Sequence, residues 1–258
     1  MHGQAVRLGA LGPPGELAGG RHDRHPNRPG QPFPQALGGC VTTGDGLQVG
    51  PDTAGLLAAL GVERYAIYVQ DYGAPVGWRL ALRDPSAITA IVTQNGNGYT
   101  DGLVPAFWDP VLAAASTPGA EGDAELREAL TLDTIRWQYT HGVPDPERVS
   151  PDAWLADFEA LQRRGNEDVQ VALFRDYPSN IALYPALHEY LRQSQVPLLA
   201  VWGRNDEIFG PAGATAFARD LPDAEIHLLD GGHFLLESHL DTVAGYLRGF
   251  LGRVLQPA

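Results

Sequence analysis

A carboxylate stands where the chain is expected to turn from a strand into a helix. Asp71 comes directly after the apolar run "RYAIYVQ" and is followed by Tyr72 and Gly73. A sharp strand-to-helix turn exposes its middle residue at the carboxyl end of the strand and requires a small residue two positions later. The pattern fits a nucleophile on such a turn. It fits equally well an aspartate that caps the following helix.

Two further residues could work together with Asp71. Asp206, in "WGRNDEIF", and His233, in "GGHFLLE", each follow an apolar run that predicts a strand. A carboxylate nucleophile needs a histidine to activate water in a later step and an acid to orient that histidine. Taken singly, His233 also fits an ordinary loop histidine, and Asp206 fits a cap of the helix entered at Pro211. Three such residues at three strand ends predict a catalytic triad.

Other acids and histidines compete for these roles. Glu207 adjoins Asp206, whereas Asp230 stands only three residues before His233, which leaves little chain for turning back toward it. We therefore prefer Asp206 as the acid. The remaining histidines of this part of the chain fit worse, because they lie inside or at the start of expected strands and helices: His188, His227 and His239.

Taken together, the motifs resemble a known family. In this order, "VQDYGAPVG", "WGRNDEIF" and "GGHFLLE" resemble the branch of the α/β-hydrolase superfamily that contains haloalkane dehalogenases and epoxide hydrolases. The resemblance runs from about residue 52 to 250 and implies a mostly parallel sheet flanked by helices, with an inserted helical cap. Val69 stands where ester-cleaving relatives carry the first glycine of "GxSxG", and it suits the aspartate branch.

The resemblance implies hydrolysis in two steps. A carboxylate, with a pKa of about 4, is charged at neutral pH and can displace a leaving group from saturated carbon without a base. The product would be an alkyl ester of Asp71, which water activated by His233 would hydrolyse while Asp206 stabilises the imidazolium. The backbone N–H of Tyr72 would stabilise the oxyanion of that second step. The substrate would be a small apolar molecule, and neither a metal nor another cofactor is implied.

Aromatic residues bear on the choice of substrate. The resemblance to dehalogenases favours a ring N–H donor after the nucleophile, usually tryptophan, where this chain has Tyr72. The resemblance to epoxide hydrolases implies cap tyrosines that protonate the epoxide oxygen, and the sequence offers Tyr139, Tyr177 and Tyr184 without singling out a pair. We expect epoxide hydrolysis or a related cleavage of carbon–oxygen or carbon–halogen bonds.

The elements that would position these residues alternate between strands and helices. The expected strands are "RYAIYVQ", "AITAIVTQNG", 197–203 and 224–232. Short apolar strands separated by helices predict the α/β class, with a parallel sheet covered on both faces. A closing helix over 239–255 has one apolar face, made of Leu240, Val243, Leu247, Phe250 and Leu251.

The order of these elements predicts three regions. Residues 51–98 and 192–258 would form the hydrolase core, and 99–191, mostly helical, would form the cap insertion. The motif "HGVP" (141–144) copies the His-Gly-x-Pro oxyanion motif of the superfamily. It lies far behind Asp71, however, so we expect only a turn there.

Residues 1–50 differ from the rest of the chain. They hold 12 of the 31 glycines and neither tryptophan nor tyrosine, a composition that predicts an irregular, disordered segment. The family resemblance implies further strands and a His-Gly oxyanion loop before the nucleophile strand, and this segment shows neither. We therefore expect the N-terminal side of the sheet to be incomplete, replaced by a frame-shifted segment. The alternative function is an inactive remnant, at most a small-molecule binding module.

Charge and composition exclude several kinds of partner. The formal net charge is −13, and all 18 basic residues are arginine, so no basic patch for nucleic acid or an anionic membrane is expected. The single cysteine, Cys40, excludes an internal disulfide. The chain has no apolar run long enough to cross a bilayer. These features predict a soluble cytoplasmic protein that works on a small molecule and water, and they do not predict its oligomeric state.

Overall fold

The computed structural model describes residues 49–255, and the predictions for residues 1–48 lie outside it. Within the described range four strands form one parallel sheet in the spatial order β1-β2-β3-β4. They are β1 (Tyr65–Gln70), β2 (Ile88–Gln94), β3 (Leu198–Gly203) and β4 (Glu225–Leu229). The predicted α/β class and parallel sheet are confirmed, and β1 forms one edge of this described sheet.

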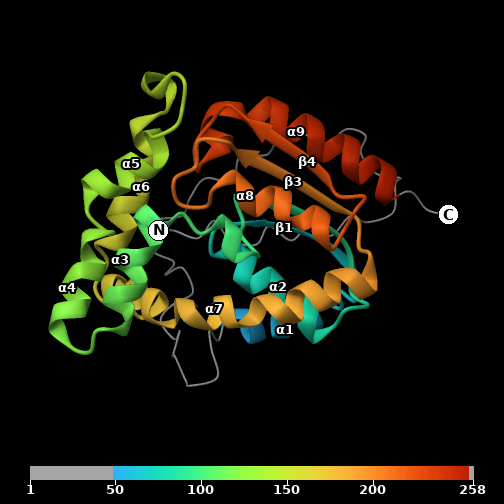
Figure 1. Ribbon diagram of the computed structural model, residues 1–258, viewed down its shortest axis with the longest axis horizontal. Helices are drawn as coiled ribbons and strands as arrows, with labels where there is room; N and C mark the ends of the chain where they lie inside the picture. Colours follow the sequence, from blue (N-terminus) through green and yellow to red (C-terminus); the bar gives the residue numbers. More distant parts are fainter. Residues whose placement is uncertain (1–48, 256–258) are drawn as a thin grey trace, which may run out of the picture.

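Helices cover both faces of the sheet (Figure 1). On one face, Val243 and Phe250 of α9 (Leu235–Val254) form a hydrophobic cluster with Val92 and Val201 of the central strands. The other face is covered by helices from four separate parts of the chain. These are α1 (Val49–Ala59), α2 (Gly73–Arg83), α8 (Pro211–Ala216) with η3 (Phe217–Arg219), and α7 (Asn166–Ser194).

The closing helix differs from its prediction at the N-terminal end. It begins at Leu235, four residues earlier than expected, and is bent at His239, whose φ of −131° is not helical. Because of this bend Leu240 is 59% exposed, so its predicted place on the buried face is wrong. The rest of the predicted face packs against the sheet, as expected.

The segment between β2 and β3 is helical and gathers at one end of the molecule (Figure 1). Its elements are η1 (Thr100–Gly102), α3 (Pro105–Ser116), α4 (Ala120–Glu128), α5 (Leu132–Thr140), η2 (Pro146–Arg148), α6 (Pro151–Leu161) and α7. Helix α7 has 29 residues and runs from this group of helices back along the sheet domain. The boundary predicted at residue 191 therefore falls inside a continuous helix, and the division into core and cap stays a prediction.

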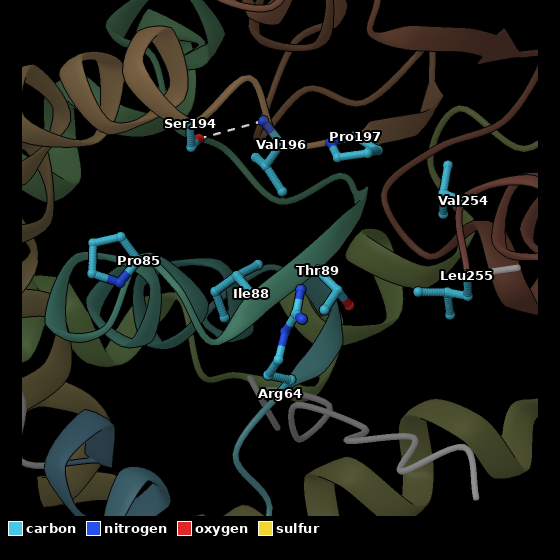
Figure 2. A pocket seen from close by; sticks show the side chains of 9 residues that line it. All are labelled: Arg64, Pro85, Ile88, Thr89, Ser194, Val196, Pro197, Val254 and Leu255. Carbon is cyan, nitrogen blue, oxygen red and sulfur yellow. Dashed lines mark hydrogen bonds between the residues drawn. The ribbon is translucent and has the colours of Figure 1, made fainter. Parts of the chain in front are cut away.

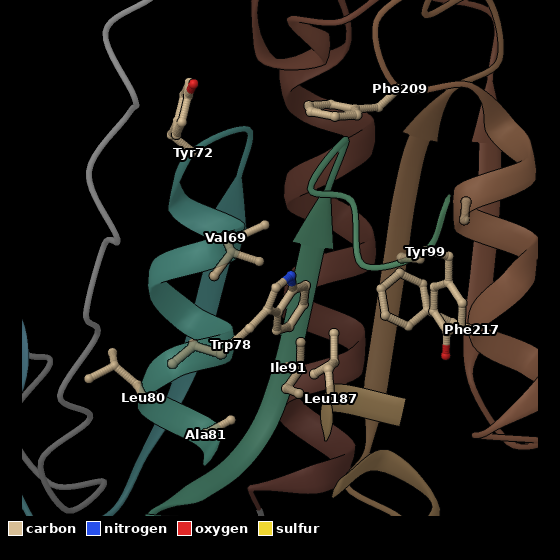
Figure 3. Packing of buried hydrophobic residues seen from close by; sticks show 14 of the residues in the cluster. Val69, Tyr72, Trp78, Leu80, Ala81, Ile91, Tyr99, Leu187, Phe209 and Phe217 are labelled. Atoms are coloured by element: carbon tan, nitrogen blue, oxygen red, sulfur yellow. The ribbon is translucent and has the colours of Figure 1, made fainter. Parts of the chain in front are cut away.

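A single hydrophobic cluster joins the sheet region to the inserted helices. It contains Trp78 of α2 and Trp202 of β3, and it continues through Trp108 of α3 and Tyr177 of α7. Figure 3 shows part of this packing, with Trp78 lying between α2 and the sheet. Burial of such large aromatic side chains contributes most of the hydrophobic stabilisation in a core of this kind.

Close contact between α2 and β1 fixes the turn that joins them. A Cβ added at Gly77 would lie 2.6 Å from Cγ1 of Val69, so only glycine lets the helix approach the strand this closely. Val69 is fully buried and stands two residues before Asp71 in the chain. The strand, the turn and the helix therefore hold Asp71 in a defined position.

A pocket of about 510 Å³ lies away from the carboxyl ends of the strands (Figure 2). It is lined by residues that precede or begin strands, such as Arg64, Ile88 and Pro197, together with Leu255 near the end of the described chain. None of the predicted site residues lines it. No helix in residues 49–255 is long and apolar enough to cross a membrane.

Candidate active site

Asp71 lies on a sharp turn at the end of β1. Its φ is +46°, in the left-handed region that few side chains adopt, and its carbonyl accepts a hydrogen bond from the N–H of Ala74 at 3.0 Å. Helix α2 begins at Gly73 with Tyr72 as N-cap, and the Asp71 carboxylate accepts no amide hydrogen bond within the described chain. The alternative interpretation of Asp71 as a helix cap is therefore wrong. Its side chain projects from the turn without a capping role.

Asp206 is held by four hydrogen bonds in the loop after β3. One carboxylate oxygen accepts from the backbone N–H groups of Ile208 at 2.8 Å and Phe209 at 3.1 Å. The other accepts from Nδ2 of Asn95 at 2.6 Å and lies 2.9 Å from Nδ1 of His233. These four contacts fix the direction of the Asp206 carboxylate.

Asp206 does not cap the next helix. The N-cap of α8 is Gly210, in extended conformation, and it makes no side-chain cap hydrogen bond. The interpretation of Asp206 as a cap of the helix entered at Pro211 is therefore wrong. All four contacts of its carboxylate belong instead to the loop that carries it and to two neighbouring loops.

Asn95 is a site residue that the sequence did not reveal. It follows β2, is completely buried and has a φ of +47°. Its side chain donates to Asp206 and accepts from the N–H of Gly203 at 3.3 Å, so it ties the ends of β2 and β3 together. The only available signal was the pair Asn95-Gly96 at a strand end, which is typical of tight turns.

His233 lies between the two carboxylates. Its Nδ1 faces Asp206, and its Nε2 is 3.7 Å from Oδ1 of Asp71, which is longer than a hydrogen bond. Nε2 is buried and has no hydrogen-bond partner among the described residues. The backbone carbonyl of His233 accepts a hydrogen bond from Gln94 at 3.4 Å, which anchors its loop to the end of β2. The structure thus brings together the three residues of the predicted triad.

The charges around His233 set its protonation. Burial by itself lowers the pKa of the imidazole, because it penalises the charged form. The charge and hydrogen bond of Asp206, with a further contribution from the charge of Asp71, outweigh burial and raise the pKa above its usual 6.5. The two carboxylates therefore make the imidazole of His233 more basic than that of a free histidine.

The competing acids are engaged elsewhere. Oδ1 of Asp230 accepts a hydrogen bond from Asn205 at 3.0 Å, and Glu207 lies 3.1 Å from Nε2 of His141. Neither makes a recorded contact with His233.

The other histidines pack against aromatic rings or contact neighbouring side chains. His188 stacks on Tyr99 at 4.1 Å, as expected from its apolar helix, and His227 inside β4 stacks on Tyr246 at 3.8 Å. His239 contacts the hydroxyl of Ser238.

Tyr72 and Tyr177 lie near Asp71, and Tyr184 is hydrogen-bonded to Tyr177 and Asn97. Tyr72 packs edge-on against Tyr177 at 5.8 Å, and its buried hydroxyl has no partner in the part of the chain described here. Burial, followed by the charge of Asp71, raises the pKa of Tyr72 well above its usual range. Burial first, and then Tyr184, Tyr72 and Asp71, likewise raise the pKa of Tyr177. Burial raises the pKa of Tyr184 to about 12, against hydrogen bonds to Tyr177 and Asn97 that lower it.

Tyr139 belongs to a different environment. Its hydroxyl donates to Asp157 of α6 at 2.5 Å, and its ring stacks on Phe234 at 4.0 Å. The hydroxyl is thus engaged within the inserted helices, although Phe234 is the immediate neighbour of His233.

The motif "HGVP" forms a turn, as predicted, and it packs on two loops of the site. Gly142 has a φ of +74°, and a Cβ there would lie 2.6 Å from the carbonyl oxygen of Asn205. A Cβ on Gly232 would overlap the carbonyl oxygen of His141. Asn205 also donates to the carbonyl of Gly142 at 2.9 Å. The turn after α5 is therefore in direct backbone contact with the loops that carry Asp206 and His233.

A small cavity of about 10 Å³ lies beside the triad. Its walls come from the end of α5, from the Asp206 loop and from His233: Trp137, Gln138, His141, Asp206, Glu207, Ile208 and His233. Within residues 49–255, no group of three or more histidine, cysteine or acidic side chains has the arrangement of a metal site.

Comparison with known proteins gives three matches of interest. The chain is 43% identical over 201 residues to the uncharacterized hydrolase YNR064C of Saccharomyces cerevisiae, which covers 73% of this chain and 66% of that protein. It is 25% identical over 199 residues to 2-hydroxy-6-oxononadienedioate/2-hydroxy-6-oxononatrienedioate hydrolase 2 of Pseudomonas putida, covering 76% of this chain and 66% of that protein. The chain thus spans just under two thirds of each relative.

Among solved structures, a mutant of haloalkane dehalogenase DatA from Agrobacterium tumefaciens has a similar fold. The TM-score is 0.62 with 19% identity, and the match covers 79% of this chain and 72% of that one. The family model for the alpha/beta hydrolase fold matches residues 52–240, which include all three residues of the candidate triad. The chain therefore belongs to the α/β-hydrolase fold family.

Proposed function

We propose that this hydrolase opens small apolar epoxides through a covalent ester on Asp71. One observation carries the proposal: a carboxylate on a strained strand-to-helix turn faces a buried histidine that a second carboxylate orients. A carboxylate is already charged at neutral pH and can attack saturated carbon directly. Hydrolysis of the resulting ester then needs a base, which is the role we assign to His233.

In the first step, an oxygen of Asp71 attacks a ring carbon and the carbon–oxygen bond of the epoxide breaks. The released oxygen needs a proton, and Tyr177 and Tyr184 supply a donor there. They lie seven residues apart on α7, and both are buried. Their raised pKa values keep both phenols protonated at neutral pH, so each remains a hydrogen-bond donor. Tyr139 is not assigned this role, since its hydroxyl is bound to Asp157.

In the second step, water attacks the carbonyl carbon of the Asp71 ester. His233 takes the proton from water at Nε2, and Asp206 stabilises the imidazolium that forms. The N–H of Tyr72 follows the nucleophile and has no acceptor among residues 49–255, so it is free to donate to the oxyanion. Collapse of the tetrahedral intermediate breaks the acyl carbon–oxygen bond, and His233 returns a proton to the departing oxygen of the diol. The second proton of the water, left on Asp71, returns to the tyrosine that protonated the epoxide oxygen in the first step.

Haloalkanes are the second candidate substrates, because they share the first step. Halide release is assisted by ring N–H donors, but Trp78, Trp108 and Trp202 each donate to a backbone carbonyl. Trp137 lines the small cavity beside His233 and is the indole that favours this candidate. The hydroxyls of Tyr72, Tyr177 and Tyr184 suit a leaving alkoxide better, and for this reason we rank epoxides first.

The relatives support hydrolysis but do not identify which type of bond is cleaved. The yeast relative is named a hydrolase, and the Pseudomonas putida relative is named a hydrolase of oxononadienedioate compounds. Because the chain spans just under two thirds of each, the activity of the whole protein is part of the proposal. An inactive remnant or a binding module is the alternative that the experiment must separate from an enzyme.

The test is to trap the ester. His233→Gln is incubated with styrene oxide and with 1-bromobutane, and the intact protein and its peptides are weighed by mass spectrometry. We expect the mass to rise by one whole epoxide, located on Asp71, because the second step has lost its base. The double variant Asp71→Asn with His233→Gln is the control and should stay unmodified. A folded His233→Gln protein that gains no mass from either reagent would favour the binding module or remnant.

A further inference from the structure

Gln138 carries a buried polar group that the proposed chemistry does not use. It lies in α5, is 2% exposed, and its Nε2 has no hydrogen-bond partner in the described chain. Nε2 of His233 is in the same situation. Buried polar atoms are nearly always hydrogen-bonded to protein or to ordered water, because an unpaired one destabilises the fold, so each of these two atoms is expected to have a partner.

The two residues line the same cavity. Its volume of about 10 Å³ matches a single water molecule, which needs two to four polar partners to bind in a protein interior. Gln138 and His233 are both lining residues, so a water molecule in the cavity has both as neighbours.

The backbone holds Gln138 at this place. Helix α5 ends in the turn at His141 and Gly142, and that turn is in direct contact with Asn205 and Gly232. The imidazole of His141 also pairs with Glu207 at 3.1 Å. The end of α5 is thus a fixed wall of the site, and the amide of Gln138 keeps its position relative to His233.

We propose that one water molecule binds between the Gln138 side-chain amide and Nε2 of His233, and that this water is the nucleophile of the second step. Gln138 then acts as a water-binding residue supplied by the inserted helices. The Nδ1–H of His233 is committed to Asp206, so Nε2 of the neutral ring is the acceptor for a water proton. The same Nε2 lies 3.7 Å from Oδ1 of Asp71, so a water bound to it is beside the ester, whose carbonyl carbon its remaining lone pair would attack.

The role of the water as nucleophile rests on the proposed function, whereas its position between Gln138 and His233 does not. Its first test therefore needs no substrate: a high-resolution crystal structure of the full chain and of Gln138→Leu. We expect one water within hydrogen-bond distance of both nitrogen atoms in the parent, and no water there in the variant. A dry cavity in the parent, or a water that contacts other groups only, would overturn the inference.

The second test separates the two chemical steps. With styrene oxide, rapid-quench mass spectrometry follows formation and decay of the ester in the parent, Gln138→Leu and Gln138→Met. We expect ester decay to slow by about 10-fold and ester formation to change less than about twofold, since one hydrogen bond to the attacking water is lost. Gln170→Leu, a glutamine of α7 that does not line the cavity, should leave both rates unchanged.

Either result has a defined meaning. Unchanged decay in a folded Gln138→Leu or Gln138→Met protein, or an equal loss in both steps, would contradict a role in binding the second-step water. If His233→Gln forms no ester at all, the proposed function fails, whereas the crystallographic water between Gln138 and His233 is still decided by the first test.

Discussion

Asp71 holds a backbone conformation that most side chains avoid. At a φ of +46°, the usual clash of Cβ with the following carbonyl costs about 1–2 kcal/mol, and aspartate and asparagine tolerate it better than other residues. The same residue sits 3.7 Å from the imidazole of His233. Strain at a turn of this kind is typical of functional sites, where the neighbouring structure enforces it.

Asp71→Asn should therefore remove the nucleophile without unfolding the protein. We expect no ester with any epoxide and a free energy of unfolding within about 1 kcal/mol of the parent, because asparagine accepts the left-handed region. Asp71→Val should also be inactive, and its free energy of unfolding should be about 1–2 kcal/mol lower than that of Asp71→Asn, since a β-branched side chain is strained there. Urea unfolding of both variants measures the difference. Equal stability of the two would contradict a strained turn.

Asp206→Asn should change the pH dependence of ester hydrolysis. In the parent, the reaction needs neutral His233, so its rate should rise with pH through a pKa above 6.5. The charge of Asp206 is the largest effect that raises this pKa, so its removal should lower the pKa. The increase of the hydrolysis rate with pH should then occur at lower pH, and the maximal rate should be smaller. The decay of the trapped ester between pH 5 and pH 9 measures this shift. A rate profile that does not move would contradict the electrostatic role.

The same shift links His233 to stability. Because the folded-state pKa of His233 is raised, the protonated ring stabilises the fold, fully so below the unfolded pKa of about 6.5. This contribution is lost as the pH rises through the higher folded value. We expect the His233 part of the stability, measured as the difference between the parent and His233→Gln, to shrink across that range. Thermal melts of both proteins at a series of pH values would show it, and a constant difference would contradict it.

Single residues at strand ends could be predicted from the sequence, whereas their partners could not. Asp71, Asp206 and His233 each follow an apolar run, and that pattern alone places them at the carboxyl edge of a parallel sheet. Asn95 and Gln138 lie beside them only because of strand register and because α5 packs on the loops. Asn95 and Asp206 are 111 positions apart in the chain, and Gln138 and His233, which line the same cavity, are also distant in sequence, so no local pattern records that they are neighbours.

Between elements, the contacts that hold the site together are made by backbone. The turn after α5 meets the histidine loop at Gly232, where a Cβ would overlap the carbonyl oxygen of His141. The same turn meets the Asp206 loop at Gly142, where a Cβ would lie 2.6 Å from the carbonyl oxygen of Asn205. Backbone has no rotamer with which to relieve a clash, so such contacts fix the distance between two elements.

Gly232→Ala should therefore displace the loop that carries His233. We expect a loss of about 1–3 kcal/mol in stability, as for other overpacked sites, together with slower ester hydrolysis. Gly245→Ala in α9 is the matched control, because nothing lies within 4 Å of its added Cβ, and a helical alanine is favoured by about 1 kcal/mol. Denaturant unfolding compares the two. A Gly232→Ala protein as stable and active as the parent would refute the backbone contact.

Helix lengths were the least predictable feature at this scale. Helix α7 continues through Pro178 and Pro185, although proline inside a helix removes a hydrogen bond and normally ends or bends it. The helix survives because buried residues along it, such as Phe174, Tyr184 and Leu187, pack against its neighbours. Tertiary packing overrides local preference here, and it also places the predicted boundary at residue 191 within the helix.

Over the whole molecule, one hydrophobic cluster joins the sheet to the inserted helices. Trp78 and Trp202 of the core belong to the same cluster as Trp108 and Tyr177 of the insertion. We expect the insertion and core to unfold in one transition, with helix content and tryptophan fluorescence changing together in urea. Two separate transitions would show that the insertion is an independent unit.

The class of fold could be predicted from the chain, because apolar strands alternating with helices allow few other arrangements. The sheet order and the identity of the family agree with that expectation. Which helix covers which face could not be predicted, since α1, α2, α7 and α8 come from distant parts of the chain. The exposed Leu240 shows the same limit, as a bend at His239 turns it away from the sheet.

The glycine turn after α5 also bears on how substrate and product exchange. Since this turn is held by backbone contacts to the loops of Asp206 and His233, the insertion cannot move away at that point without displacing these two residues. We expect any opening of the insertion relative to the sheet to be a rotation about this turn. The rate of product release would then depend on α4, which lies away from the turn, whereas α3 is itself tied to the Asp206 loop by the hydrogen bond from Trp108 to Ile208.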